Sequence, residues 1–438
     1  MIHTDVLIVG AGPAGSAAAI TLARAGRQVL LIDQQDFPRD KICGDGLIPD
    51  AMQAFEQLGV KEKVRALATP VLGLTCHGPK GGSLDIPGDL AVLPRKILDD
   101  LLVQTAIEAG ATFKTPWRFQ RLMTENGRTI GAEVKVRDTL LDDTTFNIRA
   151  NWTILATGAA VSALQNAQHC TRPHPSAMAM RGYVHNPDFK GLNDRLHISW
   201  HKAYAPGYGW IFPCPDGVFN IGVGIYGLHH HLQDTHWRAQ LAKLPGLQHI
   251  SRLKPNNPNK ANKPNLNEIF KQFVSTNPLA QALLETGTFV GELKGAPLRC
   301  SLEGAKPASP GLLIAGEAVG STYALTGEGI GKAMETGIMA AQAIVGSQMD
   351  TKAESQTHIQ TDSLIISQYE HALQTLTPKF DIYRRANIIN RMPWLIDLAI
   401  KRGNKSPKLV RRMSLVLEEK ANPARLFTAK GAWKFLTE

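Results

Sequence analysis

Short apolar runs that end at a glycine or an acidic residue mark the N-terminal part of the chain. Asp5–Val9 is apolar after its first residue and stops at Gly10, and Gln28–Ile32 is a second run that stops at Asp33. Runs of this length and character are typical of parallel strands that are buried on both faces. Between them, Ser16–Ala25 is rich in helix-forming residues. The order therefore predicts a strand–helix–strand unit.

Similar patterns return further along the chain. We expect a helix over Arg95–Ala109, whose apolar residues fall on one side, and a buried strand over Asn151–Gly158 that runs into its final glycine. Gly311–Glu317 predicts a strand with a polar end, and Gly329–Val345 predicts a long helix. Several short aliphatic and aromatic runs between residues 170 and 226 favour antiparallel strands. We therefore expect an α/β fold, or α+β overall, with an inserted antiparallel sheet.

The composition is that of an ordinary globular protein. The chain has 438 residues, of which 43% are hydrophobic and 20% charged, and roughly 150 residues per domain suggests two to three domains. Five widely spread cysteines without a CxxC pair predict neither a disulfide framework nor a structural zinc site. The first strand begins near residue 5, and no charge-free apolar run reaches about 18 residues. We therefore expect neither a signal peptide nor a membrane span, and a cytoplasmic location.

The net charge of +10 is concentrated near the C-terminus. Residues 378–438 carry 14 Lys and Arg against 5 Asp and Glu, and the rest of the chain is nearly neutral. A basic tail can bind an anionic membrane at its inner face, and Pro393–Arg402 suits a short interfacial helix. A solvated basic face on helices packed against the body is the alternative. Aromatic residues do not interleave with the basic ones, so we expect no nucleic-acid partner.

A glycine pattern lies between the first strand and the first helix. Gly10, Gly12 and Gly15 form a GxGxxG sequence, and Asp33 ends the next strand about twenty residues on. Gly10 permits the tight turn, Gly12 lets the backbone approach a pyrophosphate, and Gly15 lets the helix lie close to the strand. Asp33 can accept hydrogen bonds from ribose hydroxyls. With both strands and the helix in order, the pattern predicts a dinucleotide site.

Other chemistry is not supported by the sequence. His229–His231 is more consistent with a polar turn than with a metal site, because successive side chains diverge and no partner spacing accompanies them. Ser16, Ser162 and Ser321 lack the G-x-S-x-G pattern of a hydrolase nucleophile. The Pro- and Asn-rich stretch Pro255–Asn265 predicts an exposed loop.

Four segments together resemble the geranylgeranyl reductase family of FAD-dependent oxidoreductases, which share the p-hydroxybenzoate hydroxylase type of fold. Gly10–Gly15 is the first, and Arg39–Leu47 is similar to the family's K-x-C-G-x-G-L loop beside the flavin. Tyr208–Pro213 fits Y-x-W-x-F-P and is followed by Asn220–Gly224, which fits N-V-G-x-G. Gly316–Ile330 is the fourth segment. No second glycine-rich fingerprint is visible, which favours a single nucleotide cofactor, FAD.

The resemblance implies a set of site residues. Tyr208 and Trp210 would line the substrate cavity from one face of a strand, although both also suit an apolar core. Cys43 would lie near the flavin ring, although a free cysteine also suits a small buried hydrophobic position. Tyr208, Trp210 and Cys43 are the catalytic candidates, and Asp45 is a weaker candidate for proton delivery. The implied cofactor contacts are Gly10, Gly12, Ala14, Gly15, Asp33, Cys43, Gly44, Arg95, Gly158, Gly316, Glu317, Gly327, Gly329 and Ile330.

The resemblance also implies an activity. The main hypothesis is reduction of C=C bonds in an isoprenoid or other apolar lipid by hydride transfer from reduced flavin, with NAD(P)H or a reduced electron-transfer protein as electron donor. A flavin-dependent monooxygenase, a halogenase or an oxidative dehydrogenase acting on a small aromatic or secondary metabolite is the alternative, because the fold does not determine the reaction. A flavoprotein that binds without turnover is a third class.

The domain organisation follows from these assignments. We expect a discontinuous, Rossmann-like FAD-binding domain over residues 1–69, 95–172 and 287–350. A substrate-binding domain would contain residues 70–94 and 173–286, and a basic, helical C-terminal region would follow over residues 351–438.

Overall fold

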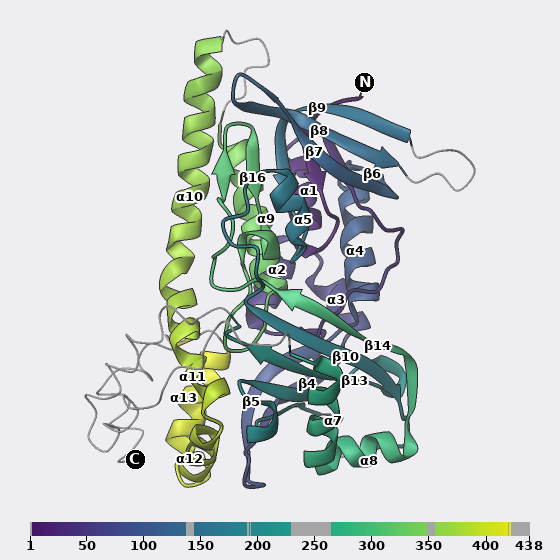
Figure 1. Ribbon diagram of the computed structural model, residues 1–438, viewed down its shortest axis with the longest axis vertical. Coiled ribbons are helices and arrows are strands. Elements are labelled where there is room, and N and C mark those ends of the chain that lie inside the picture. The colour runs from purple at the N-terminus through teal and green to yellow at the C-terminus, as the bar shows by residue number, and fades with distance from the viewer. Residues whose placement is uncertain are drawn as a thin grey trace.

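The computed structural model describes residues 2–136, 144–190, 192, 194–228, 264–347, 355–418, 420 and 421. Two sheets form the centre of the molecule, one above the other in Figure 1, and a long helix runs along one side of the upper sheet. The predictions for His229–His231 and for most of Pro255–Asn265 lie outside the described residues. The predicted mixed α/β class with helices toward the C-terminus is confirmed.

The first sheet is built on the two apolar runs that open the chain. Strand β1 pairs in parallel with β2 on one side and with β9 on the other, and Val6 lies opposite Val29 and Trp152. Val6, Leu7 and Ile8 have no solvent exposure, which explains why their run contains no polar residue. The strand order is β15-β16-β9-β1-β2-β6, and the hairpin β7–β8 extends it from β9. The bounds are β1 (Ile2–Val9), β2 (Val29–Ile32), β6 (Thr112–Lys114), β7 (Trp117–Glu125), β8 (Arg128–Val136), β9 (Thr144–Leu155), β15 (Ala308–Ser309) and β16 (Leu312–Ile314).

Helices from residues 13–108, 161–166 and 330–345 accompany this sheet. Helix α1 begins at Pro13, three residues before the helix-forming stretch Ser16–Ala25, because proline suits the first turn of a helix, where its missing N–H is not needed. Helix α9 contacts α1 at a glycine, since a Cβ on Gly337 would lie 2.2 Å from the Ala14 carbonyl oxygen. The bounds are α1 (Pro13–Arg24), α2 (Pro49–Gln57), α3 (Lys61–Leu67), α4 (Arg95–Glu108), α5 (Val161–Asn166) and α9 (Ile330–Val345).

The second sheet has the order β14-β10-β13-β12-β11-β4-β5-β3. Its pairs are antiparallel except β11 with β4, so the antiparallel strands predicted between residues 170 and 226 are present. Helices α7 and α8 cover one face. A Cβ on Gly209 would lie 2.3 Å from the Phe273 ring of α7, so the absence of a side chain at Gly209 permits this contact. The bounds are β3 (Gly46–Leu47), β4 (Thr69–His77), β5 (Ser83–Val92), β10 (Ala177–His185), β11 (Leu196–Ser199), β12 (Gly207–Pro213), β13 (Val218–Tyr226), β14 (Thr288–Leu298), α7 (Leu266–Thr276) and α8 (Pro278–Thr286).

The division into domains stays a prediction. Two strands of the second sheet, β3 and β14, fall in the ranges 1–69 and 287–350 that we assigned to the FAD-binding domain. Their cross-strand partners decide this placement: Gly46 lies opposite Val92, and β14 pairs along β10. A local pattern does not reveal which sheet accepts a strand.

The C-terminal helices contact both parts of the molecule. Helix α10 lies along the first sheet (Figure 1), where the Tyr369 hydroxyl donates to the Ile314 carbonyl at 2.6 Å. Helix α12 packs on the β4–β5 hairpin through the buried Ile396 and Ile400. None of the described helices is both long and apolar enough to cross a membrane. The remaining helical bounds are α10 (Ser355–Ala386), α11 (Ile388–Arg391), α12 (Trp394–Gly403), α13 (Pro407–Leu417), and the short 3-10 turns η1 (Lys202–Tyr204), η2 (Pro215–Gly217) and η5 (Gly316–Val319).

Candidate active site

A pocket opens where the carboxyl ends of the parallel strands meet the second sheet. Val9 and Ile32, the last residues of β1 and β2, line it on one side, and Ile198 and Tyr208 line it from β11 and β12. Ligands of open α/β sheets bind outside the carboxyl ends of the strands. The two sheets therefore form one site, with the glycine turn at one end and an apolar sheet face at the other.

Most of the predicted site residues line this pocket. Gly15 and Gly316 are the two that do not. A Cβ on Gly15 would lie 1.8 Å from the Gly10 carbonyl oxygen, and a Cβ on Gly316 would lie 2.6 Å from the Cβ of Ala14. These two glycines therefore permit the close packing behind the pocket. The predicted residues that line it are Gly10, Gly12, Ala14, Asp33, Cys43, Gly44, Arg95, Gly158, Tyr208, Trp210, Glu317, Gly327, Gly329 and Ile330.

The glycine turn is shaped to receive an anion. Gly10 has φ +102°, and a Cβ there would lie 2.4 Å from the Ala156 carbonyl oxygen. A Cβ on Gly12, in contrast, would meet nothing closer than the guanidinium groups of Arg95 at 3.7 Å and Arg39 at 3.8 Å. Gly12 is also the N-cap of α1 and provides no side-chain cap, so the first N–H groups of the helix are available to a ligand. Two cations and a helix N-terminus suit a pyrophosphate.

Buried carboxylates hold the two arginines in place. The Asp99 side chain is fully buried and accepts from Arg95 Nε at 2.6 Å and from Arg39 at 3.0 Å. Asp33 uses both carboxylate oxygens within the turn, where they accept from the backbone N–H groups of Ala11 at 2.9 Å and Gln35 at 3.0 Å. Asp33 thus connects the second strand to the glycine turn while lining the pocket. Its contact with a ribose stays a prediction.

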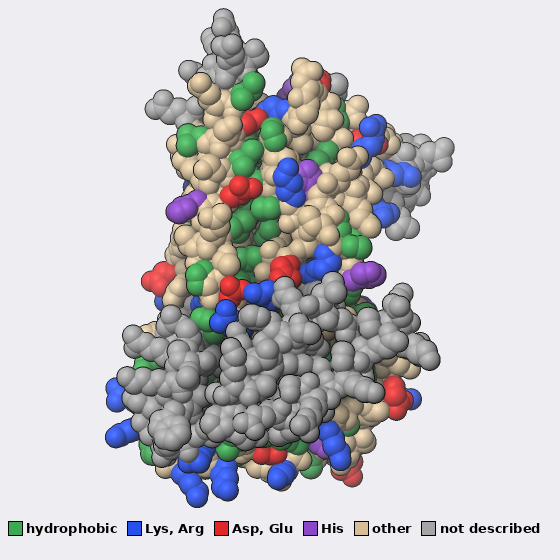
Figure 2. Space-filling model, turned by 60° about the vertical axis from the view of Figure 1, so that its left-hand side comes forward, with side chains coloured by type: hydrophobic (Ala, Val, Ile, Leu, Met, Phe, Trp, Pro, Cys, Tyr) green, Lys and Arg blue, Asp and Glu red, His purple; other side chains and the backbone are tan. Residues whose placement is uncertain are grey.

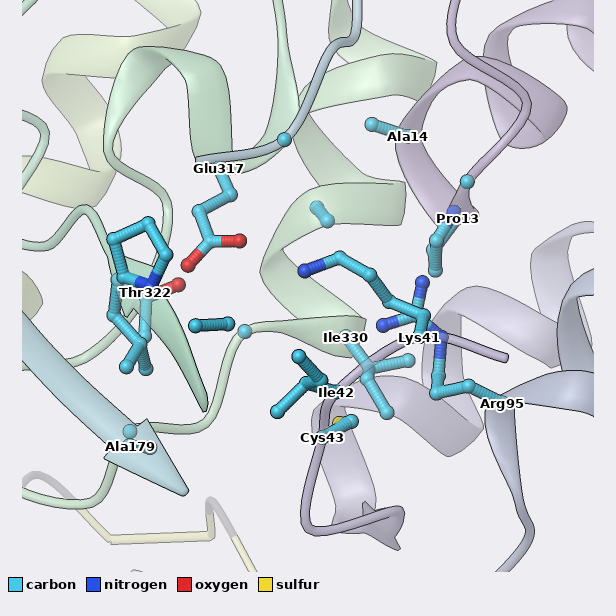
Figure 3. A pocket seen from close by; sticks show the side chains of 18 of the residues that line it. Pro13, Ala14, Lys41, Ile42, Cys43, Arg95, Ala179, Glu317, Thr322 and Ile330 are labelled. Atoms are coloured by element: carbon cyan, nitrogen blue, oxygen red, sulfur yellow. The ribbon is translucent and has the colours of Figure 1, made fainter. Parts of the chain in front are cut away.

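Side chains from separate elements converge in the middle of the pocket (Figure 3). The Lys41 side chain extends across the space toward the side from which Glu317 projects, and the Cys43 sulfur lies beside Ile330. Burial raises the pKa of the Cys43 thiol, which keeps it protonated at neutral pH. Helix α9 has Gly329 as its N-cap and no side-chain cap, so a second helix N-terminus faces this space.

Aromatic side chains of the second sheet close the other end. The Tyr208 and Tyr226 hydroxyls are 2.9 Å apart and their rings are stacked, with 5.3 Å between centroids. Tyr208 also donates to the Thr326 carbonyl oxygen, one residue before Gly327. Trp210 Nε1 donates to Asn220 Oδ1 at 2.9 Å. Tyr208 and Trp210 each belong to an apolar cluster and also line the pocket. Their contact with a substrate stays a prediction.

Asp45 is a fully buried carboxyl at the edge of this aromatic group. Its Oδ2 accepts from the Tyr183 hydroxyl at 2.6 Å and from Asn220 Nδ2 at 2.7 Å, and its Oδ1 accepts from the Arg95 backbone N–H at 3.3 Å. Burial raises the pKa of Asp45 to about 6, and the hydrogen bonds oppose that rise. Asp45 lines the pocket beside Cys43.

The residues present fit an FAD cofactor. The open face of Gly12, the two arginines and the uncapped α1 terminus suit the pyrophosphate, and the uncapped α9 terminus suits the pyrimidine edge of a flavin, where negative charge develops on reduction. Within the described ranges, no group of three or more His, Cys, Asp or Glu side chains is placed to hold a metal ion.

Comparisons with known proteins agree with this site. The family model described as an FAD binding domain matches residues 3–205. A menaquinone reductase of Mycobacterium tuberculosis is 32% identical over 353 residues, which is 78% of this chain and 76% of the relative. The chain belongs to the geranylgeranyl reductase family of FAD-dependent oxidoreductases. It is an FAD-dependent oxidoreductase, as predicted.

Further members of the geranylgeranyl reductase family show the same likeness. Digeranylgeranylglycerophospholipid reductase 2 of Methanopyrus kandleri is 31% identical over 225 residues, 51% of this chain and 55% of that protein. The crystal structure of a geranylgeranyl bacteriochlorophyll reductase-like protein from Thermoplasma acidophilum superposes with a TM-score of 0.73 at 20% identity, over 98% of this chain and 99% of that one. The second comparison concerns the fold alone.

The pocket also contains residues that were not among our predicted site residues, and three of them, Arg39, Arg181 and Tyr226, show what the sequence did or did not signal. Arg39 belongs to the Arg39–Leu47 segment of the family resemblance. Its positive charge in that segment was the available sequence signal for a contact with a pyrophosphate. Tyr226 and Arg181 had no local signal, because they reach the pocket through strand register: Tyr226 pairs with Ala177, and Arg181 pairs with Gly222. Only the assembled second sheet places them at the site.

Proposed function

We propose that the protein reduces carbon–carbon double bonds of an isoprenoid chain or a similarly apolar lipid. The observation that carries this proposal is the continuity of the pocket. Its lining combines the glycine turn, Cys43 and Tyr208 with an apolar face of the second sheet and Leu417 on α13. The printed names of the relatives, a menaquinone reductase and a digeranylgeranylglycerophospholipid reductase, support a lipid or quinone substrate. The apolar lining residues beyond Tyr208 are Leu74, Leu90, Ala179, Leu196, Ile198, Phe212, Pro297, Leu298 and Leu417.

The chain's own residues bind, orient and exclude water in this scheme. Reduced FAD would supply a hydride to one alkene carbon. The apolar sheet face holds the substrate chain, and its burial excludes water from the reacting carbons. Tyr208, fixed by Tyr226 and the Thr326 carbonyl, and Trp210, fixed by Asn220, form the wall beside the reacting part of the substrate.

We propose that electrons arrive from NAD(P)H or from a reduced electron-transfer protein. The sequence contains one GxGxxG fingerprint with its strand, helix and acidic residue, at Gly10–Asp33, which supports a donor that binds transiently. Anaerobic mixing of the oxidised protein with NADH, NADPH or a reduced ferredoxin distinguishes the donors. Bleaching of the flavin absorbance by one of them identifies it, and absence of bleaching by all three overturns this choice of donors.

We also propose that the protein contacts an anionic membrane surface from the cytoplasmic side. Helices α12 and α13 carry basic residues, and Lys and Arg side chains gather at the lower end of the face shown in Figure 2. Trp394, at the start of α12, is 48% exposed, while Ile396 and Ile400 of the same helix are buried. The apolar pocket reaches Leu417 at the end of α13, so a lipid chain has a short path from such a surface.

Anaerobic single turnover tests the proposed function. The FAD-loaded protein is reduced and mixed either with a polyprenyl substrate in detergent or with oxygenated buffer. Rapid reoxidation by the alkene, with deuterium from D₂O appearing at one product carbon, is the expected result. A transient flavin–oxygen absorbance without any response to polyprenyl substrates overturns the proposal in favour of a monooxygenase.

A further inference from the structure

Alkene reduction needs a proton as well as a hydride, and the pocket contains one carboxyl with the surroundings of a proton donor. Asp45 is 0% exposed and lines the pocket two residues after Cys43, whose Sγ accepts from the Asp45 backbone N–H at 3.4 Å. Its φ of +65° and the pairing of the next residue, Gly46, with β5 turn the side chain toward the second sheet. Unpaired buried carboxylates are costly, so the groups that face Asp45 determine its state.

The hydrogen bonds distinguish the two carboxyl oxygens of Asp45. Oδ2 accepts two strong hydrogen bonds, from the Tyr183 hydroxyl at 2.6 Å and from Asn220 Nδ2 at 2.7 Å. Asn220 cannot reverse its amide, because its Oδ1 already accepts from Trp210 Nε1. A proton on the carboxyl therefore belongs on Oδ1, whose only hydrogen bond among the described residues is the long one from the Arg95 backbone N–H, at 3.3 Å.

We propose that Asp45 Oδ1 carries the proton that is delivered to the substrate in the reduction proposed above, on which this inference rests. Reduced FAD, when bound, would supply the hydride to one alkene carbon, and the π bond would break. The O–H bond of Asp45 then breaks, its proton forms the second new C–H bond, and the carboxylate keeps the electron pair. The alkene is reduced by two electrons and the flavin is oxidised by two, so that atoms and charge balance. A proton from water restores the acid.

The titratable and charged groups around Asp45 come from several elements. Tyr183 and Arg181 face it from β10, Arg95 from α4, and the Cys43 and Cys214 thiols complete its titratable surroundings. The Arg181 guanidinium lies 4.2 Å from the centroid of the Tyr183 ring and pairs with Asp40, whose side chain is 35% exposed. Arg181 thus places a positive charge beside Tyr183 and Asp45, which lowers the pKa of the acid.

A carboxyl that titrates near the working pH is an efficient general acid. Burial raises the pKa of Asp45 to about 6, against the lowering effect of the Tyr183 and Asn220 hydrogen bonds and of Arg181 and Arg95. The acid form is required, so the rate of reduction should fall as the pH rises through about 6. Loss of the Tyr183 hydrogen bond, which stabilises the carboxylate, should move that fall to higher pH.

Asp45→Asn and Tyr183→Phe in the FAD-loaded protein test the inference. Asparagine tolerates a positive φ and keeps the shape of the carboxyl. We expect Asp45→Asn to keep its FAD and to slow single-turnover reoxidation by the polyprenyl substrate about 100-fold, with the pH dependence near 6 lost. Tyr183→Phe should keep turnover and shift the pH profile upward. The infrared carbonyl band of a protonated carboxyl provides a second readout, since it should titrate near pH 6 without substrate and vanish in Asp45→Asn.

The outcomes separate this inference from the proposed function. If the wild-type flavin is not reoxidised by the alkene, the proposed function fails, even where the infrared band titrates as expected. If the wild type turns over and Asp45→Asn matches it in rate and pH profile, the proton donor lies elsewhere and the inference is overturned. Should Asp45→Asn lose FAD, Tyr183→Phe decides, because an unshifted profile in that variant contradicts Asp45 as the donor.

Discussion

The indole of Trp210 and the amide of Asn220 form a hydrogen bond of 2.9 Å that links two adjacent strands at the floor of the pocket. The other end of the Asn220 amide donates to Asp45 Oδ2 and to the Cys43 carbonyl oxygen at 2.8 Å. One side chain therefore connects the aromatic wall of β12 with the loop that contains Cys43. Strand pairing sets this arrangement, because Trp210 lies opposite Gly222, the strand neighbour of Asn220 on the same face.

Trp210→Phe should impair turnover while FAD stays bound. The change removes the indole N–H and leaves Asn220 Oδ1 without its donor in a buried place, which costs about 1–3 kcal/mol. Trp200→Phe is a matched control, because Trp200 Nε1 donates to Asn390 Oδ1 at 2.8 Å in the same apolar cluster without lining the pocket. Thermal unfolding should show a similar loss in both variants, whereas single-turnover kinetics should change only in Trp210→Phe. Equal kinetics in the two variants would assign Trp210 to the core alone.

Asp33→Ala should weaken FAD retention. The carboxylate accepts from the Ala11 N–H at 2.9 Å, so its loss disturbs the glycine turn as well as the expected ribose contact. Asp5→Ala removes a comparable carboxylate, which accepts from the Gln28 N–H at 2.9 Å outside the pocket. The ratio of FAD to protein after purification is the measurement. Full occupancy in Asp33→Ala would contradict the fingerprint assignment.

Gly327→Ala should reduce both FAD occupancy and stability. Gly327 has φ +69°, and a Cβ there would lie 2.2 Å from the Tyr226 hydroxyl. Gly26 has a similar φ of +76° with nothing within 4 Å of its Cβ position, so Gly26→Ala measures the backbone strain alone, about 1–2 kcal/mol. Thermal unfolding should show a larger loss for Gly327→Ala, and only that variant should lose cofactor. A loss equal to that of Gly26→Ala would exclude steric pressure on Tyr226.

A pair of histidines, His197 buried and His77 partly buried, should make the protein less stable in mild acid. His77 Nε2 and His197 Nδ1 are 3.0 Å apart, and burial lowers the pKa of both, that of His197 to about 4. Below about pH 6.5 the unfolded histidine takes up a proton that the folded one does not, so this contribution to stability is lost as the pH falls toward 4. His197→Gln should show a shallower fall of the melting temperature over that range. The raised pKa of Asp45 changes stability with pH in the opposite sense, but it is present in both the wild type and His197→Gln. If the melting temperature fell as steeply in His197→Gln as in the wild type, the histidine pair would be excluded as the cause.

Charge reversal on α12 should weaken binding to anionic vesicles. Lys401→Glu with Arg402→Glu removes two basic side chains near the exposed Trp394, and a basic residue near such a surface contributes about 1 kcal/mol. Lys61→Glu with Lys63→Glu on α3 is the matched control for net charge. Flotation with phosphatidylglycerol vesicles at low and high salt is the measurement. The membrane proposal would be contradicted if the wild type did not float with the vesicles at low salt. It would also be contradicted if the α3 control reduced flotation as much as the α12 variant.

Local pattern determined the first half of the site. The run Asp5–Val9, the glycines after it and Asp33 predict strand, turn and helix from steric and hydrogen-bonding requirements that act over neighbouring residues, and these elements appear as β1, α1 and β2. The resemblance of Tyr208–Pro213 to a family motif also pointed to a wall of the pocket, and all three of its aromatic residues, Tyr208, Trp210 and Phe212, line it.

Tertiary structure alone decided which distant groups meet. The strands β10 and β13 bring Tyr183 and Asn220 to the buried Asp45 from far along the chain, and no local pattern encodes that contact. Burial raises the pKa of Asp45, and the hydrogen bonds from these two side chains oppose the rise. The register of the second sheet likewise placed Tyr226 against Gly327. Strand partners and burial depend on the whole assembled sheet, because pairing energy comes from cross-strand neighbours. The sequence by itself therefore determined the cofactor end of the site, and the fold determined the chemistry at its other end.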